Sequence, residues 1–266
     1  MRGLVIALTG LYAAASSFAQ QTSPVRARIS SPISFYDDAD PSVHGMLNVS
    51  ESYAYNKIPV GQDVTFTSTY ASLGLNKRID VSANVSYGRS VFEGTRIAAL
   101  SDSYFGSKLL LMPETKRRPA LALEPMIEVL GDASIAGSPL APKRVNYVLP
   151  FITQKSFDYY RIYYMAGYLS RGIIYNSLAF ELNRWSRITP LVIMSGSRLT
   201  RELGLVSALG LNRSRSDVIG SVAVTLRPGW SLFVSSGRSV GRVDLNSSHY
   251  QITGGLSFNV RLWGKK

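Results

Sequence analysis

Apolar and polar residues alternate with a period of two along most of this chain. The clearest stretch is RIDVSANVSYGRS at 78–90, where apolar side chains occupy every second position and mostly polar ones the others. This alternation is typical of a β-strand with one apolar face. It recurs in about twelve segments, near 43–55, 63–75, 78–90, 102–112, 119–131, 144–153, 157–170, 172–184, 187–199, 215–227, 230–241 and 249–262. We assign 203–212, which also resembles a strand, to a long loop, because a thirteenth strand would separate the two ends of the chain.

The segments and their connections have the lengths of a membrane barrel. An ordinary globular strand has about 5–6 residues, whereas a tilted strand needs about 9–11 to cross a bilayer. Connections after even-numbered segments are short: 76–77, 113–118, 154–156, 185–186 and 228–229. Several after odd-numbered segments are long: 91–101, 132–143, 200–214 and 242–248, with a tight exception at 171–172. Short turns on one side and long loops on the other are typical of bacterial outer-membrane barrels.

Such strands must close on themselves. In hydrocarbon no water can bond to the free backbone groups of a sheet edge, so only a closed barrel pairs them all. We therefore predict an all-β fold, a transmembrane antiparallel up-and-down β-barrel of about 12 strands with both termini periplasmic.

The first residues resemble an export signal. Met1 and Arg2 precede the apolar stretch LVIALTGLYAAA, and small residues follow at Ser17 and Ala19. This arrangement predicts a signal peptide at 1–19, cleaved after Ala19, rather than a membrane anchor. Residues 20–42 are polar and irregular, and are either a periplasmic lead or a segment that folds into the barrel mouth. The barrel itself is predicted to span 43–263.

Composition narrows the choice of partners. The chain is 45% hydrophobic and 17% charged, with a net charge of +12 and no cysteine. The lack of cysteine excludes a disulfide scaffold, a thiolate metal site and a cysteine nucleophile. An exported chain is a poor candidate for binding nucleic acid, so we expect no nucleic-acid partner. The many arginines near the long loops either pair with lipopolysaccharide phosphates, which suit the arginine fork, or form a solvated rim.

Assigning faces by alternation predicts which charged residues line the lumen. The candidates for a constriction are Asp80, Glu124, Glu128, Arg161, Glu181, Arg227 and Arg261. Asp217 also falls on this face, and Thr65, Thr67, Thr69, Ser82, Asn84, Ser221 and Asn259 add neutral polar groups. These charges either select a solute or form a network that fills and rigidifies the lumen.

Aromatic residues lie near the ends of the predicted strands. The candidates for a girdle are Tyr53, Tyr70, Tyr160, Tyr168, Trp185, Trp230 and Trp263. Tyrosine and tryptophan favour the membrane–water boundary because their rings are apolar and their tips polar. Ordinary strand propensity would also enrich tyrosine.

Motifs for catalysis and cofactor binding are lacking from the sequence. There is no HExxH and no glycine-rich phosphate loop, so we expect no cofactor and no enzyme activity. His44 and His249 each have serines close by, which keeps a lipid-facing hydrolase as a minor alternative. Asp37, Asp38 and Asp40 could ligate a cation, but no Gly–Glu frame follows them, and no metal site is predicted.

Four stretches resemble a known family of outer-membrane transporter-like barrels, the MetA-pathway-of-phenol-degradation type. They are SLGLNKRIDVSANVSYG at 72–88, LSDSYFGSKLLLMPETKRRPALALEPMIEVLGDA at 100–133, MAGYLSRGIIYNSLAFELNRWSRITPLV at 165–192 and the closing part of 216–263. The resemblance implies a twelve-stranded barrel with a transport role, and carries over no catalytic or binding residues. The chain departs from the family in ending with Gly264, Lys265 and Lys266 after Trp263.

Together these observations predict an outer-membrane channel or transporter that passes or binds a small solute without an energy source. Its expected partners are outer-membrane lipid and lipopolysaccharide, the solute, and the barrel-assembly machinery during biogenesis. A structural barrel that binds lipopolysaccharide or a partner protein is the alternative.

Overall fold

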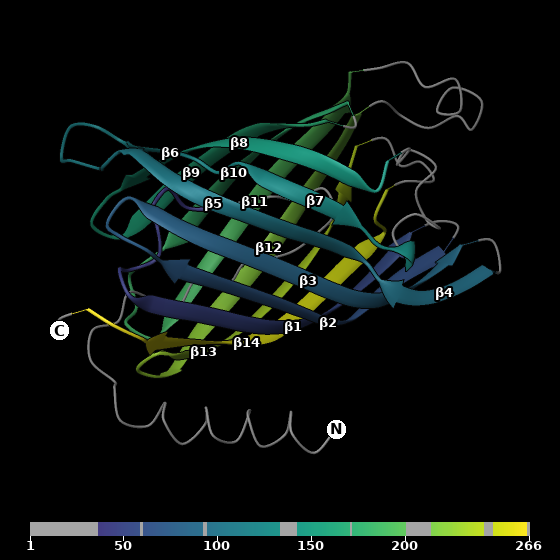
Figure 1. The fold of residues 1–266 in the computed structure, drawn as a ribbon, viewed down its shortest axis with the longest axis horizontal. Coiled ribbons are helices and arrows are strands. Elements are labelled where there is room, and N and C mark those ends of the chain that lie inside the picture. The colour runs from purple at the N-terminus through teal and green to yellow at the C-terminus, as the bar shows by residue number, and fades with distance from the viewer. Residues whose placement is uncertain are drawn as a thin grey trace.

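The computed structural model describes residues 37–58, 61–92, 95–133, 143–170, 172–200, 214–241 and 247–264. The predicted signal peptide at 1–19, the following residues to 36 and the strand-like stretch at 203–212 lie outside the described residues. The described chain folds into a single sheet of fourteen strand segments (Figure 1).

Every pairing in this sheet is antiparallel, and neighbours in the sheet are mostly neighbours in the chain. The segments are β1 (Met46–Ile58), β2 (Gly61–Gly74), β3 (Ile79–Phe92), β4 (Thr95–Leu100), β5 (Asp102–Met112), β6 (Ala120–Leu123), β7 (Met126–Leu130), β8 (Val145–Ser156), β9 (Tyr160–Leu169), β10 (Ile173–Leu182), β11 (Ile188–Leu199), β12 (Ser214–Arg227), β13 (Trp230–Val240) and β14 (Tyr250–Arg261).

Two strands of the wall are interrupted, which reduces the fourteen segments to twelve strands. β4 and β5 both pair with β3, one after the other along its length, and are separated only by Ser101. β6 and β7 both lie between β5 and β8 and are separated by Glu124 and Pro125. Proline cannot donate to a β-ladder, which explains the second break. The predicted antiparallel barrel of twelve strands is confirmed.

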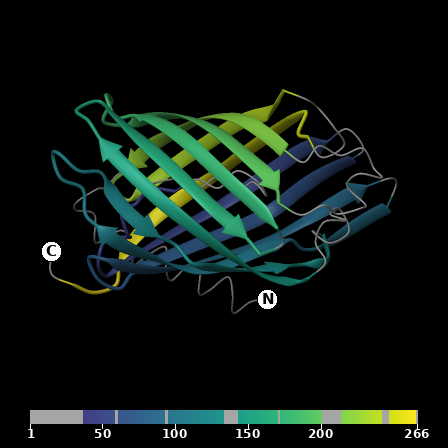
Figure 2. The same cartoon turned by 90° about the horizontal axis from the view of Figure 1, so that it is seen from above.

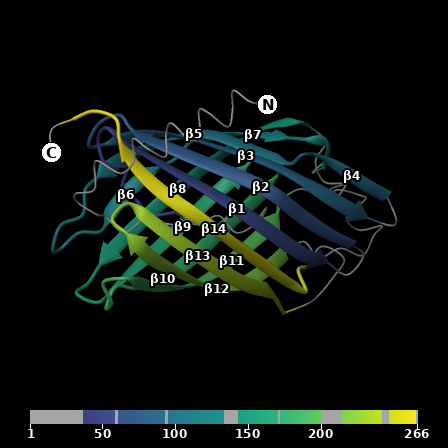
Figure 3. The ribbon, with the colours of Figure 1, turned by 90° about the horizontal axis from the view of Figure 1, so that it is seen from below.

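The barrel closes where the first and last strands meet. β1 pairs with β14 from Met46↔Arg261 to Lys57↔Tyr250, and these two strands lie side by side with β2 in Figure 3. The backbone N–H of Leu262 donates to the carbonyl of Gly45 at 2.8 Å, so both ends of the described chain meet at one end of the barrel. Figure 2 shows the tilt of the strands that closure requires.

The two ends of the barrel differ. The turn end carries the connections 75–78, 113–119, 157–159, 183–187 and 228–229, together with both ends of the described chain. The loop end carries the others. The predicted long loop at 91–101 is wrong: β3 continues to Phe92 and β4 starts at Thr95, so this region is an extended hairpin. In Figure 1 β4 extends beyond its neighbours at the loop end.

Alternation along the strands separates an apolar outer face from an inner face. On β8, Val145, Tyr147, Leu149 and Phe151 are exposed, whereas the residues between them are buried. Register shifts interrupt the alternation at Thr65/Thr67 in β2 and at Thr225/Arg227 in β12. Within the part of the chain that the structure describes, no helix is long and apolar enough to cross a membrane.

Candidate functional site: the barrel interior

Small hydroxyl side chains cover one part of the inner wall, formed by β1 to β3 and β12 to β14. All are buried: Ser50, Ser68, Ser72, Ser86, Ser221, Ser231, Ser235, Ser239, Thr253 and Ser257. Neighbouring hydroxyls bond to one another across strands, as Ser68 Oγ and Ser86 Oγ do at 2.8 Å. Ser68 Oγ also donates to Asn84 Oδ1 at 3.3 Å. This wall presents hydroxyl groups to the interior, and its serine and threonine side chains are short.

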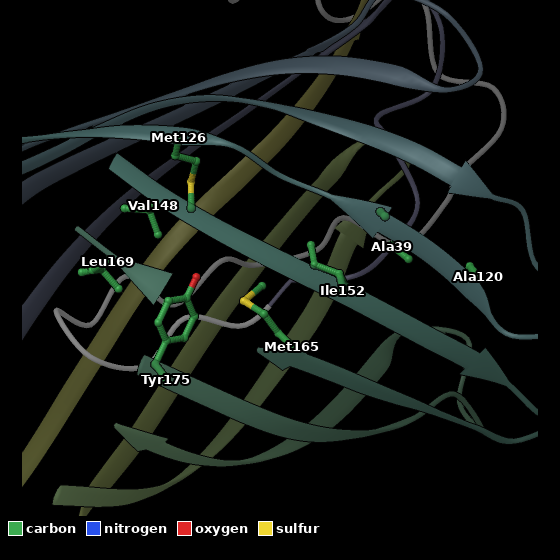
Figure 4. Packing of buried hydrophobic residues seen from close by; sticks show 9 residues of the cluster. Ala39, Ala120, Met126, Val148, Ile152, Met165, Leu169 and Tyr175 are labelled. Carbon is green, nitrogen blue, oxygen red and sulfur yellow. The ribbon is translucent and has the colours of Figure 1, made fainter. Parts of the chain in front are cut away.

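The opposite part of the inner wall holds most of the buried apolar residues. Its buried residues come from β6 to β10 and include Ala120, Ala122, Met126, Val148, Ile152, Met165, Leu169 and Tyr175. Figure 4 shows these side chains converging inside the barrel, with Ala39 among them. A second buried group, formed by Tyr163, Ala179, Leu191, Ile193 and Ile219, continues the apolar surface over β9 to β12. The interior therefore has one wall of small hydroxyls and, opposite it, a wall in which apolar side chains lie among buried polar groups such as Glu124, Glu128 and Gln154.

Residues 37–42 enter the interior from the turn end. The backbone N–H of Ala39 donates to Gln154 Oε1 at 3.1 Å, and Gln154 Nε2 donates to Asp40 Oδ2 at 2.9 Å. The backbone N–H of Ser42 donates to Asp80 Oδ2 at 2.7 Å. Of the two alternatives for 20–42, the described part of this segment folds into the barrel mouth.

Lys108 holds this segment, and sequence reasoning missed its role. Its Nζ lies 2.6 Å from Asp37 Oδ2 and 3.8 Å from Asp38 Oδ1, and all three residues are buried. The two aspartates that were considered as cation ligands thus face an ammonium group. Lys108 lies on the inner face of β5, and the alternation of apolar and polar residues along this strand was the one signal in the sequence that could have placed it there. Its partners could not be predicted, because Asp37 and Asp38 lie in a segment without alternation.

Glu124 and Glu128 lie on the inner face at the break between β6 and β7. They are 1% and 0% exposed, respectively. The hydroxyl of Tyr104 donates to Glu128 Oε1 at 2.8 Å. The N–H of Glu124 donates to the carbonyl of Pro150 at 3.1 Å, which keeps the interrupted strand joined to β8. Asp80, 3% exposed, lies on the inner face of β3 and bonds to the entering segment as described above.

Arg161 and Glu181 meet across β9 and β10, where they are paired in register. Arg161 Nη1 lies 3.8 Å from Glu181 Oε1 and donates to the Tyr163 hydroxyl at 3.2 Å. That hydroxyl donates to Glu181 Oε2 at 2.7 Å. The tyrosine therefore links the two charges within the inner wall.

A further ion pair lies on the inner wall at the loop end. Arg215 Nε lies 2.9 Å from Asp217 Oδ2, and its Nη2 donates to Ser248 Oγ at 3.1 Å. Ser239 Oγ donates to Asp217 Oδ1 at 2.6 Å and accepts from the N–H of Ser248 at 2.8 Å. Ser248, 1% exposed, is thus drawn into the barrel from the β13–β14 connection.

Two sequence candidates, Arg227 and Tyr70, lie on the opposite face of the wall from the one that alternation predicted. A third, Arg261, lies at the margin of the interior. Arg227 follows the register shift in β12, is exposed, and has its guanidinium 4.7 Å from the Trp230 ring centroid. Arg261 is half-buried on the last residue of β14, at the turn end. Tyr70 pairs with Ser50 and Asn84, both buried, so it belongs to the inner face and not to the girdle. The shift at Thr65/Thr67 is the reason, because it moves Thr67 and Thr69 outward.

The other girdle candidates lie on the outer face or in the turns. Tyr160 stacks on Phe157 and Phe180 at the turn end, with centroids 4.5 and 5.3 Å apart. Trp230 stacks on Phe258 at 5.4 Å. At the loop end, the ring centroids of Tyr168 and Tyr147 lie 6.3 Å apart. Tyr53, Trp185 and Trp263 are 50%, 53% and 43% exposed.

The histidines make backbone and ring contacts. His44 Nδ1 bonds to the carbonyl of Leu75 at 2.8 Å, and its ring meets Trp263 edge-on at 6.5 Å. The N–H of His249 donates to the carbonyl of Lys57 at 2.8 Å. Within the described ranges, no group of three or more histidine, cysteine, aspartate or glutamate residues is arranged to hold a metal ion.

Glu114 joins two connections at the turn end. Its carboxylate accepts from the N–H of Ser156 at 2.8 Å and from Ser156 Oγ at 2.9 Å, and lies 3.4 Å from Lys155 Nζ. Partial burial raises the pKa of Glu114, but the bonds from Ser156 and Lys155 outweigh it and hold the pKa below its usual 4.5.

No protein-family model matches the chain, and no curated protein sequence is significantly similar to it. Solved structures do share its fold. The COG4313 outer membrane channel from Pseudomonas putida F1 is 8% identical, with a TM-score of 0.66 over 85% of this chain and 100% of that one. The NanC porin is 9% identical, with a TM-score of 0.56 over 80% and 98%. The KdgM porin is also 9% identical, with a TM-score of 0.50 over 79% and 98%. The chain therefore has the fold of outer-membrane channel barrels.

Proposed function

We propose that the protein is an outer-membrane channel that passes a small solute passively between the loop end and the turn end. The observation that carries the proposal is the closed barrel with an apolar outer face and a buried, partly polar inner face. The loop end then faces the exterior and the turn end the periplasm, after export by a cleaved signal peptide.

Selectivity in this proposal comes from the width of the lumen and from its charges. A barrel of eight strands is filled by side chains, whereas sixteen leave an open channel, so twelve strands leave a narrow lumen. Asp80, Glu124, Glu128, Arg161 and Glu181 are the proposed constriction. Arg261 belongs to its turn-end mouth, whereas Arg227 lies over the outer-face ring of Trp230 and is no longer included.

The entering segment narrows this path. Residues 37–42 occupy part of the interior, and their main ion pair is with Lys108. A solute can pass beside them along the wall of small hydroxyls, or after the segment leaves. The experiment is swelling of proteoliposomes in neutral sugars of increasing size. The proposal expects swelling with the smallest solutes and none with large ones; no swelling with any solute would contradict it.

The close packing of the interior favours one second candidate. If the lumen never opens, the barrel is a structural protein whose exposed loop-end cations bind lipopolysaccharide or a partner protein. Lys143, Arg144, Arg198 and Arg238 are exposed in this region. Retention of lipopolysaccharide through purification without any solute passage is the outcome that this candidate predicts.

A further inference from the structure

We propose that the turn end of the barrel carries a ring of cations that binds the anionic phospholipid headgroups of the membrane leaflet around it. The ring is formed by exposed lysines and arginines: Lys77 and Arg78 in the connection 75–78, the run KRR at 116–118, Arg184 and Arg187 in the connection 183–187, and Arg227 at the end of β12. This binding surface lies on the rim of the barrel and does not depend on the channel function proposed above.

Carboxylates do not offset the charge of this ring. In the turn-end connections that the structure describes, Asp158 is the one exposed acidic residue. Glu114 is partly buried, and its carboxylate is already bonded to Ser156 and lies 3.4 Å from Lys155 Nζ. Members of the ring form no ion pair with any residue of the described ranges. The ring therefore presents positive charge that the barrel itself does not neutralise.

The cations are distributed around the barrel and not gathered on one side. The connection 75–78 joins β2 to β3, 113–119 joins β5 to β6, and 183–187 joins β10 to β11, while Arg227 ends β12. These strands are spread over the whole closed sheet. A protein partner would dock on one side of the rim, whereas a membrane leaflet surrounds it. The distribution of the cations therefore favours lipid as the occupant.

The ring also lies at the depth of the membrane boundary. Trp185 stands between Arg184 and Arg187, and the guanidinium of Arg227 lies 4.7 Å from the ring centroid of Trp230 on the outer face. Tryptophan favours the membrane–water boundary, which is where the lipid phosphates lie. The arginine fork suits a phosphate, and clustered cations beside a membrane attract anionic lipid. A zwitterionic headgroup carries its own ammonium group, so an anionic headgroup is the better match.

Tryptophan fluorescence tests the proposal, because Trp185 lies within the ring. Trp230→Phe and Trp263→Phe leave Trp185 as the only tryptophan of the chain. This variant is reconstituted in vesicles of phosphatidylcholine and phosphatidylglycerol of fixed composition, in which an equal, small share of one lipid or of the other carries brominated acyl chains. We expect brominated phosphatidylglycerol to quench the emission about twofold more than brominated phosphatidylcholine, since the cations enrich anionic lipid around them.

Two double substitutions in this variant locate the effect. Arg184→Gln with Arg187→Gln removes the cations on both sides of Trp185 and should make the two brominated lipids quench equally. Arg198→Gln with Arg238→Gln removes two exposed arginines at the loop end and is the matched control, which should keep the excess. All four arginines are exposed, so both variants are expected to fold. Without either substitution, sodium chloride at about 1 M should also abolish the excess, because the Debye length is then about 3 Å.

Three results would overturn the proposal. Equal quenching by the two lipids at low salt, with all arginines present, would show that the ring does not select anionic phospholipid and would indicate a soluble anionic partner instead. An excess that survives Arg184→Gln with Arg187→Gln would show that these cations do not cause it. An excess that disappears in the loop-end control would place the lipid at the other end of the barrel.

Discussion

Charged side chains inside this barrel are held in place by opposite charges and hydroxyl groups. Lys108 pairs with Asp37 and Asp38, while Arg161 and Glu181 share the hydroxyl of Tyr163. In a low-dielectric interior such a pair adds little to the stability of the fold compared with two apolar side chains in its place. Loss of one partner is costly, however, because it leaves the other charge buried and unpaired. The arrangement therefore makes single charge removals a sensitive probe of the interior.

Lys108→Met should destabilise the barrel by about 3–5 kcal/mol, because it leaves Asp37 and Asp38 buried without their cation. Urea unfolding in lipid vesicles measures the change. Lys155→Met is the matched control: its partner Glu114 is 20% exposed and Lys155 is 25% exposed, so the expected loss is no more than about 1 kcal/mol. Equal losses from the two substitutions would contradict the role given to Lys108.

Glu114 should make the stability of the turn end depend on acidity. Its pKa is lower in the folded state than in the unfolded chain, so its carboxylate stabilises the fold above pH 4.5. This contribution is lost as the pH falls through the folded pKa. The difference in unfolding free energy between the wild type and Glu114→Gln should therefore be present at pH 7 and vanish in acid. A difference that stays constant across this range would contradict the assignment.

At the scale of elements, alternation was sufficient to predict the strands but not their irregularities. Each of the twelve predicted segments overlaps a strand of the wall, because one face meets lipid and a register slip would expose the other. The bulges in β2 and β12 are invisible to alternation, and they misplaced Tyr70 and Arg227. The hairpin at 91–101 was missed because its pattern is weak.

The interior could be predicted only in part. Glu124, Glu128 and Glu181 lie on the inner face that alternation assigned to them. The pairing of Lys108 with Asp37 joins segments far apart in the chain, and no local pattern encodes it. The roles of these residues in selectivity stay predictions.

Glycines distinguish the two faces of the strands. A Cβ at Gly255 would lie 2.3 Å from the carbonyl oxygen of Glu51 and 2.6 Å from the buried ring of Phe233, whereas a Cβ at Gly220 would meet nothing within 4 Å. Gly255→Val should therefore cost about 1–3 kcal/mol through overpacking. Gly220→Val should be neutral or stabilising, since valine suits an exposed strand position facing lipid. Urea unfolding of both variants compares them; a larger loss at Gly220 would contradict the assignment of faces.

At the scale of the whole molecule, the barrel has a direction. The three tryptophans of the chain, Trp185, Trp230 and Trp263, all lie at the turn end, in or beside its connections. Tyr55, Tyr147, Tyr168 and Tyr250 lie toward the loop end. Tryptophan favours the boundary over the bilayer centre.

Because all three tryptophans lie at the turn end, their fluorescence reports how deep this end of the barrel lies in the bilayer. In vesicles of brominated lipids, bromines near the headgroups should quench the emission more strongly than bromines near the ends of the acyl chains. Stronger quenching from the bilayer centre would show that the outer face does not meet lipid in the manner described.

Single-channel conductance in planar bilayers tests the central claim most directly, since a closed wall with a polar interior must conduct ions if it forms a path. The account predicts small discrete current steps from the wild type and larger steps from Lys108→Met, in which the segment at 37–42 loses its main ion pair. Bilayers that stay silent with both proteins would contradict it.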